Sequence, residues 1–137
     1  MKTIDDVRFL DLQCFSELNG NLIPIEFDKN IPFDVKRIFY IFGVLDRQAR
    51  GKHSHFKTEQ ILICLNGTCE VFCADGITSK KYILDSPKKA LYIPEMIWDE
   101  QVYTTEDTVL VVLSNTFYDK RDYIEDWEEF LICRKNY

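Results

Sequence analysis

The segment Arg50-Gly51-Lys52-His53-Ser54-His55-Phe56-Lys57-Thr58-Glu59 contains both histidines of the chain and continues into the apolar stretch Gln60-Ile61-Leu62-Ile63-Cys64-Leu65-Asn66-Gly67. Successive side chains of a β-strand point to opposite faces, so His53 and His55 share one face. Imidazole has an unperturbed pKa close to neutrality, and two such rings facing one space can accept and donate protons. The spacing therefore favours a functional pair over two unrelated histidines.

Length, composition and charge limit the kind of protein that this sequence encodes. The 137 residues suit one domain, which we expect to span residues 1–137. Hydrophobic residues make up 46% and charged residues 29%, as in ordinary globular chains. The formal net charge of −6 argues against a protein that coats nucleic acid by releasing counterions, so nucleic acid is not an expected partner.

The chain shows no sequence signal for a membrane or for secretion. No stretch is long and apolar enough to span a bilayer, and the start, Met1 to Asp6, has no apolar signal-peptide core. The five cysteines, at positions 14, 64, 69, 73 and 133, are odd in number and match no zinc-binding spacing. Because three of them fall in expected strands, we interpret them as buried, reduced thiols. We expect a cytoplasmic protein without a membrane partner.

Most of the chain reads as short β-strands separated by turns. Besides the histidine segment, we expect strands at residues 7–12, 22–27, 35–44, 59–65, 68–73, 77–84, 90–93, 97–103 and 108–113. Asn19-Gly20, Asn66-Gly67 and Asp75-Gly76 are turn signals, and residues 45–49 form a polar loop. Pro24 lacks an amide donor, which predicts a sheet edge for its strand. About ten short strands with regular turns predict a β-sandwich or barrel.

Alternation gives the strand at 35–44 two faces. Arg37, Phe39 and Ile41 share one face, whereas Lys36 and Tyr40 share the other. The residues alone leave two interpretations open for each candidate: Arg37 is a surface or a site residue, and Tyr40 is a core or a site residue.

The C-terminal part has a helical pattern. Asp122 followed by Glu125 matches a capping box, and Ile124, Trp127 and Leu131 recur at helical spacing. We expect a helix of about three turns that packs Trp127 on an apolar surface. Its apolar stripe is more simply core or dimer surface than a binding site.

The spacing around the histidines resembles the first motif of the cupins. It reads His53-x-His55-x3-Glu59-x7-Gly67, with the two histidines, the glutamate and the closing glycine in that order. In the second cupin motif a proline precedes a glycine and a histidine; here Pro94 fits, Met96 replaces the glycine, and Asp99 replaces the histidine. The resemblance implies an all-β cupin double-stranded β-helix, or jelly roll, with a short C-terminal helix.

Further runs are similar to the nucleotide-sugar 3,4-ketoisomerases, WxcM-like members of the cupin superfamily. They extend from about Asn19 to Phe130. The runs are Lys36-Arg37-Ile38-Phe39-Tyr40-Ile41-Phe42, Arg50-Gly51-x-His53-x-His55, residues 59–67, Leu84-Asp85-Ser86-Pro87, Trp98-x-Glu100 and Tyr118-Asp119-x-x-Asp122-Tyr123-Ile124. These enzymes act on TDP-linked 4-keto-6-deoxyhexoses, so the resemblance implies that substrate.

The resemblance also implies catalytic roles. His55 would be the base, His53 its neighbour in the proton relay, and Tyr40 a catalytic residue close to the sugar. Members of this family need no metal and no other cofactor, and none is expected here. They form homodimers that exchange N-terminal strands, which implies a second copy of the chain as a partner.

Substrate-binding residues follow from the same resemblance. Arg50 and Arg37 are candidates for the diphosphate or the sugar hydroxyls, and Lys36, Gly51, Trp98 and Glu100 complete the expected contacts. In familiar members, an arginine or tyrosine precedes the glycine near the N-terminus, and a histidine or arginine follows the tryptophan. Here these positions are Asn19 and Asp99. We expect both residues near the sugar, where they influence which face of C4 receives the proton.

The implied reaction moves the keto group of the sugar from C4 to C3. A base removes the proton from C3, which is acidic because the resulting charge spreads onto oxygen, and a proton returns at C4 from the enediol. General acid–base groups of this kind contribute about 10²–10⁴-fold each. We expect an isomerase of deoxysugar biosynthesis that serves a surface polysaccharide or glycoconjugate.

Three alternatives remain open. The first is a metal-dependent cupin enzyme with a metal on His53, His55 and Glu59, with or without Asp99. The second is a cupin sugar-nucleotide 3,5-epimerase, which would exchange protons at C3 and C5. The third is a non-catalytic module that binds a sugar nucleotide.

Overall fold

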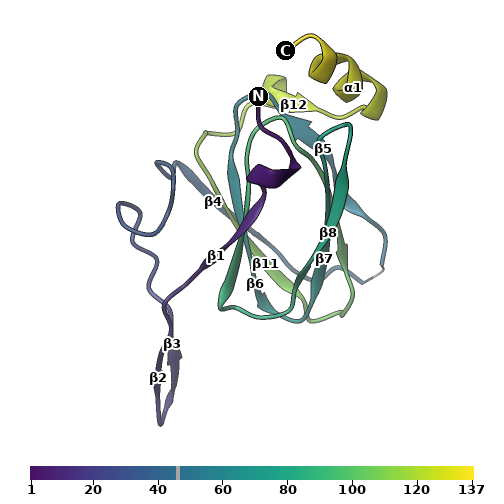
Figure 1. The fold of residues 1–137 in the computed structure, drawn as a ribbon. Coiled ribbons are helices and arrows are strands. Elements are labelled where there is room, and N and C mark those ends of the chain that lie inside the picture. Colours follow the sequence, from purple (N-terminus) through teal and green to yellow (C-terminus); the bar gives the residue numbers. More distant parts are fainter. Residues whose placement is uncertain (46) are drawn as a thin grey trace.

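Two five-stranded sheets face each other and enclose the core (Figure 1). The computed structural model describes residues 1–45 and 47–137; residue 46 belongs to the expected polar loop and lies outside the described residues. The first sheet has the order β1 (Arg8–Asp11), β9 (Lys89–Ile93), β6 (Gln60–Asn66), β11 (Val109–Ser114) and β4 (Arg37–Ile41). The second has the order β12 (Tyr123–Ile124), β5 (Arg50–His55), β10 (Trp98–Tyr103), β7 (Cys69–Ala74) and β8 (Ser79–Leu84). This is the expected jelly roll.

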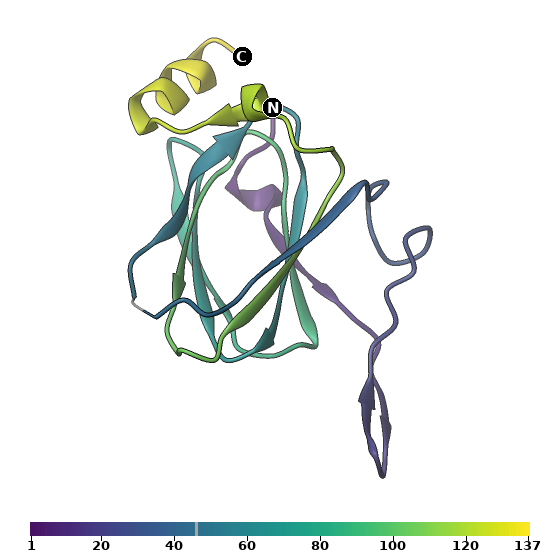
Figure 2. The ribbon, with the colours of Figure 1, turned by 180° about the vertical axis from the view of Figure 1, so that it is seen from behind.

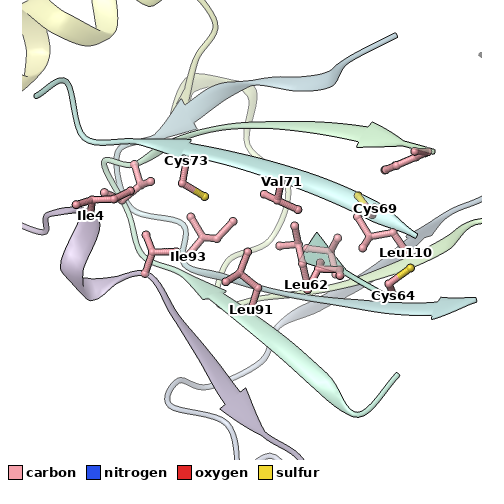
Figure 3. Packing of buried hydrophobic residues seen from close by; sticks show 14 residues of the cluster. Ile4, Leu62, Cys64, Cys69, Val71, Cys73, Leu91, Ile93 and Leu110 are labelled. Carbon is pink, nitrogen blue, oxygen red and sulfur yellow. The ribbon is translucent and has the colours of Figure 1, made fainter. Parts of the chain in front are cut away.

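The main core lies between the two sheets. Leu62, Val71 and Leu110 from facing strands are fully buried there, and Figure 3 shows the side chains of this cluster pointing toward one another. Cys64, Cys69 and Cys73 belong to the same cluster as free thiols, as expected for buried reduced cysteines. Burial raises the pKa of each of these thiols, so they stay protonated and behave as small apolar groups.

The outer face of the first sheet is covered by an irregular segment. Ile23, Ile25, Phe33 and Val35 pack there on a second cluster that includes Ile61. The expected strand at 22–27 is therefore wrong: its apolar residues cover a sheet without pairing in one, and Pro24 cannot donate a ladder hydrogen bond. Because both of its faces are covered, β6 is apolar on successive residues instead of alternating.

Residues 15–22 form a separate hairpin of β2 (Phe15–Glu17) and β3 (Gly20–Leu22). Figures 1 and 2 both show it extending away from the barrel. Its turn contains Asn19, and Leu18 beside it is 106% exposed relative to its reference state. An isolated two-stranded hairpin is only marginally stable in water.

The C-terminal helix α1 (Trp127–Lys135) begins later than expected. Asp126 is its N-cap and accepts a hydrogen bond from the Glu129 amide at 2.9 Å. Two short 3₁₀ turns, Ile4–Asp6 and Lys120–Asp122, complete the elements, and Ile124 lies in β12 instead of the helix. Trp127 packs edge-to-face on Trp98 with 5.4 Å between ring centroids, as the expected apolar contact. No helix among the described residues is long and apolar enough to cross a membrane.

Candidate active site

A small cavity is lined by residues of both sheets, from β4 and β6 in the first and from β5, β10 and β12 in the second. Its volume is about 160 Å³, below the roughly 300–1,000 Å³ of pockets that hold whole drug-sized ligands. The lining residues are Phe39, Ile41, Arg50, Gly51, His53, Gln60, Gln101 and Tyr123. The cavity is therefore of a size for part of a ligand and not for a whole drug-sized molecule.

The backbone at the start of β5 orients His53. Gly51 has φ = 81° and Lys52 has φ = 52°, and the pairing of β5 with β10 shifts register at this point. The Nδ1 atom of His53 lies 2.9 Å from the Gly51 carbonyl oxygen. Because a carbonyl only accepts hydrogen bonds, Nδ1 is the protonated nitrogen and Nε2 of the neutral ring is free to accept a proton.

His53 and His55 lie side by side, as the spacing predicts. Their ring centroids are 4.8 Å apart and the rings are nearly perpendicular at 80°. His53 borders the cavity, whereas His55 is only 4% exposed and its Nε2 has no hydrogen-bond partner among the described residues. Burial, together with the charges of His53 and Arg37, lowers the pKa of His55 from 6.5 to about 3. His55 is therefore neutral at physiological pH.

Tyr123 lies against both imidazoles. Its ring centroid is 5.0 Å from that of His53 and 4.5 Å from that of His55, because β12 pairs with β5 in a register that puts Tyr123 opposite His55. The Asp122 carboxylate accepts hydrogen bonds from the amides of Lys57 at 2.9 Å and Thr58 at 3.2 Å, which fastens β12 to the end of β5. A phenol thus stands beside the histidine pair.

Asp99 also lies beside the pair. It is opposite His53 in the β10–β5 register and is 1% exposed. Gln101 donates a hydrogen bond from Nε2 to the Asp99 carboxylate at 3.2 Å, and Tyr103 donates to the Gln101 carbonyl oxygen at 2.9 Å. Burial raises the pKa of Asp99, against the opposing influences of His53 and the Gln101 hydrogen bond.

The two arginines occupy different places. Arg37 donates from Nε to Ser114 Oγ at 3.3 Å and lies over the rings of Phe39 and Tyr118. It is close enough to His55 to lower the pKa of that ring. Arg50 is exposed and lines both the cavity and an adjoining hollow of about 450 Å³. Each arginine therefore brings positive charge to one part of the site.

Several expected site residues lie elsewhere in this chain. Tyr40 is 65% exposed on the face of β4 opposite to Phe39, where it lines the adjoining hollow, and Lys36 shares that outer face. Trp98 and Glu100 alternate with Asp99 along β10 and line an outer groove with Trp127 from the C-terminal helix. Asn19 lies in the turn of the projecting hairpin. The strand alternation that brings Asp99 inward sends its two neighbours outward.

Glu59 does not join the histidines. Its carboxylate accepts hydrogen bonds from the Tyr92 hydroxyl and, at 2.9 Å, from the Asn115 amide. Gln60, the next residue, lines the cavity instead. Within residues 1–45 and 47–137, no three His, Cys, Asp or Glu side chains are grouped closely enough to hold a metal ion. The ligand set of the metal-dependent alternative is therefore not assembled.

Of the lining residues, the apolar Phe39 and Ile41 and the polar Gln60, Gln101 and Tyr123 were not among the predicted site residues. Gln101 shares a face with Asp99 by simple alternation, and Gln60 is a polar residue inside an apolar strand, so both offered a signal. For Tyr123 the sequence held no such signal beyond its place in a family motif. The helical pattern that begins at Ile124 gave no reason to expect a strand at this position. Its position depends on the pairing of β12 with β5.

A known protein family matches nearly the whole chain. The family model described as "FdtA: WxcM-like, C-terminal" matches residues 5–135. The chain belongs to this family. A relative from Aneurinibacillus thermoaerophilus, TDP-4-oxo-6-deoxy-alpha-D-glucose-3,4-oxoisomerase, is 43% identical over 90% of this chain and 88% of its own length.

Solved structures of sugar 3,4-ketoisomerases have the same fold. QdtA, a sugar 3,4-ketoisomerase from Thermoanaerobacterium thermosaccharolyticum in complex with TDP, superposes with a TM-score of 0.93 at 36% identity, covering 97% of both chains. A histidine-to-asparagine variant of QdtA has been solved with TDP-4-keto-6-deoxyglucose. WlaRA, a TDP-fucose-3,4-ketoisomerase from Campylobacter jejuni, has a TM-score of 0.89 at 40% identity and covers 96% of this chain and 97% of its own. The expected family and its jelly-roll fold are confirmed.

Proposed function

We propose that this protein is a 3,4-ketoisomerase that moves the keto group of a TDP-linked 4-keto-6-deoxyhexose from C4 to C3, in deoxysugar biosynthesis. The observation on which the proposal depends is that His53 borders a cavity of about 160 Å³ while its Nδ1 is held by the Gly51 carbonyl oxygen, which leaves Nε2 as the nitrogen that can accept a proton. Membership in a family of sugar 3,4-ketoisomerases supports the same reaction.

His53 is the base in this proposal, in place of His55, to which the sequence resemblance assigned that role. His53 borders the cavity and its Nε2 can accept a proton, whereas His55 is buried and has a pKa of about 3. His53 Nε2 takes the proton from C3, and the C–H electron pair forms the C3=C4 bond of the enediolate. The proton then returns at C4. His55 stays neutral, and its ring packs edge-to-face against the ring of His53.

The proton transfer between the two sugar oxygens needs a second group. Tyr123 is the phenol that contacts both imidazoles and lines the cavity, so it takes this role in place of Tyr40. Arg50, exposed at the cavity and at the adjoining hollow, is placed for the diphosphate, and Arg37 lies near His55 for a sugar hydroxyl. The proposed reaction needs neither a metal nor a redox cofactor.

A homodimer with exchanged N-terminal strands is part of the proposal. The projecting hairpin exposes Phe15, Leu18 and Leu22, and apolar side chains on an unsupported hairpin favour a second copy as their covering layer. In that arrangement Asn19 would reach the partner's site, not its own. We also propose a cytoplasmic location and one domain over residues 1–137; the free buried thiols suit a reducing compartment.

Incubation with TDP-linked 4-keto-6-deoxyhexoses in deuterated buffer, followed by proton NMR, tests this function. We expect deuterium at C3 and C4, a 3-keto product and no inversion at C5. Exchange at C3 and C5 with inversion would identify a 3,5-epimerase, and binding without exchange would identify a non-catalytic module. His53→Asn should abolish exchange, whereas Lys52→Asn, at an exposed neighbour that does not line the cavity, should retain it.

A further inference from the structure

Asp99 is a buried acid beside the proposed base, at the position where familiar members have a histidine or arginine. It is 1% exposed and lies opposite His53 in the β10–β5 register. A β-carbon built on Gly51 would come within 3.2 Å of Asp99 Oδ1, so the carboxylate packs directly beneath the backbone that orients His53. In the part of the chain that the structure describes, no lysine or arginine forms a salt bridge with it.

The neighbouring hydrogen bonds favour the ionised form of this acid. Tyr103 donates its hydroxyl proton to the Gln101 carbonyl oxygen, so the Gln101 amide nitrogen is the group that faces Asp99. An amide N–H donates and a carboxylate accepts; a protonated acid would lose part of this accepting capacity. The chain Tyr103–Gln101–Asp99 is thus oriented to stabilise a negative charge next to His53.

We propose that Asp99 is a positioning residue that makes His53 a stronger base, by stabilising the imidazolium with a buried negative charge. The inference rests on the proposed function, because it assigns the proton removed from C3 to His53. When Nε2 takes that proton, Nδ1 keeps its own on the Gly51 carbonyl oxygen, and the ring becomes positively charged. The substrate gains the electron pair of the broken C–H bond, and the ring returns to neutral when the proton is delivered to C4.

The low dielectric of the protein interior strengthens the attraction between the Asp99 carboxylate and the His53 imidazolium. Opposite charges interact several times more strongly in a protein interior than in water, and a nearby opposite charge shifts the titration of a group by about 1–3 pH units. Among the described residues, the other titratable groups around the pair are His55 and Arg50 on β5, Arg37 on β4, Cys69 and Cys73 on β7, Glu100 and Tyr103 on β10, and Tyr123 on β12. Among them, Glu100 is the other acid, and it points to the outer groove.

An experiment with Asp99→Asn and the control Glu100→Gln separates the roles. Both changes remove one negative charge from β10 at nearly constant volume, the first inside the barrel and the second outside. We expect the NMR titration midpoint of the His53 ring to move to lower pH by about one unit in Asp99→Asn and to stay unchanged in Glu100→Gln. The chain has two histidines, and His55 titrates near pH 3, so the two signals are distinguishable.

Kinetics provide the second readout. We expect kcat of Asp99→Asn to fall about tenfold or more. The acidic limb of its pH–rate profile should move to lower pH, as the His53 titration does. KM should stay within about twofold of the wild-type value. An unchanged His53 titration in Asp99→Asn would overturn the proposal, and loss of activity with that titration unchanged would show that Asp99 acts directly on the substrate.

The two proposals fail in different ways. The NMR titration needs no substrate, so it reports the coupling of Asp99 to His53 even if the wild-type protein isomerises no sugar. A wild type without turnover but with the displaced titration would refute the function and retain the coupling. A fully active wild type whose His53 ring titrates identically in Asp99→Asn would refute the coupling alone. Urea unfolding of both variants checks that each is folded.

Discussion

The ring of Tyr123 lies 4.5 Å from the ring of His55, centroid to centroid, because β12 pairs with β5 directly behind the cavity. This contact puts the phenol ring beside the two imidazoles. Removing the hydroxyl alone, in Tyr123→Phe, should lower kcat about 10²-fold, within the range for one general acid–base group, and leave unfolding by urea unchanged within about 0.5 kcal/mol. Steady-state kinetics and denaturation measure both.

Tyr40→Phe is the matched control for that substitution. Tyr40 is exposed on the far face of β4, and the change removes the same atom from a residue outside the cavity. We expect full activity. A large loss in Tyr40→Phe with none in Tyr123→Phe would reverse the assignment of the phenol.

The buried His55 should make the fold sensitive to acid. Its pKa is lowered from 6.5 to about 3, so between these values the unfolded chain binds a proton at this residue that the folded chain does not. The stability contributed by the neutral ring is present above pH 6.5 and is lost as the pH falls toward 3. Comparing wild type with His55→Asn, we expect their difference in unfolding free energy to fall by about 1.4 kcal/mol per pH unit in this window. A constant difference from pH 7 to pH 4 would contradict the burial of a neutral ring.

Gly51→Ala should damage both stability and turnover. The residue has φ = 81°, and a β-carbon would meet Asp99 Oδ1 at 3.2 Å and its carbonyl oxygen at 3.3 Å. We expect a loss of about 1–3 kcal/mol and a lower kcat, because the Gly51 carbonyl holds the His53 ring. Gly76→Ala is the control: its φ is 93°, but the nearest atom lies at 3.4 Å, so it should cost about 1 kcal/mol and leave kcat unchanged. Equal effects of the two substitutions on kcat would disprove the link to His53.

Glu59 should be a structural residue and not a metal ligand. Its carboxylate is held by Tyr92 and Asn115, away from the histidines. Glu59→Gln should therefore destabilise the fold by about 1–3 kcal/mol without abolishing turnover, and overnight dialysis against a chelator should leave the wild-type rate unchanged. Loss of the rate on chelation, restored by one divalent metal, would support the metal-dependent alternative.

Exposed apolar residues on the hairpin should set the oligomeric state. Phe15 and Leu22 lie opposite each other across β2 and β3, and both are exposed. We expect Phe15→Ser/Leu22→Ser to convert a dimer to a monomer in light scattering, while Ile77→Ser, at an exposed turn residue, remains dimeric. A wild type that is monomeric at micromolar concentration would contradict the proposed exchange.

The two-residue periodicity of β-strands explains which side-chain positions could be predicted from the sequence. The two-residue spacing of His53 and His55 placed both rings on one side of β5, and alternation placed Arg37 with Phe39, and Tyr40 on the far face, as observed. Turn residues bounded most strands to within a few positions. The strand at 22–27 failed because an apolar run covers a sheet as readily as it joins one, and local propensity does not distinguish the two.

The sequence by itself determined that the chain is all-β, that it belongs with the WxcM-like cupins, and that its two histidines share a face. Only the tertiary structure decided that His53 borders the cavity while His55 is buried, that Tyr123 and Asp99 stand beside them, and that Trp98 and Glu100 point outward. Alternation is a local property that states which residues share a face. Which face turns inward, and which strand lies across from it, depends on pairings between distant segments, and these form only when the whole barrel closes.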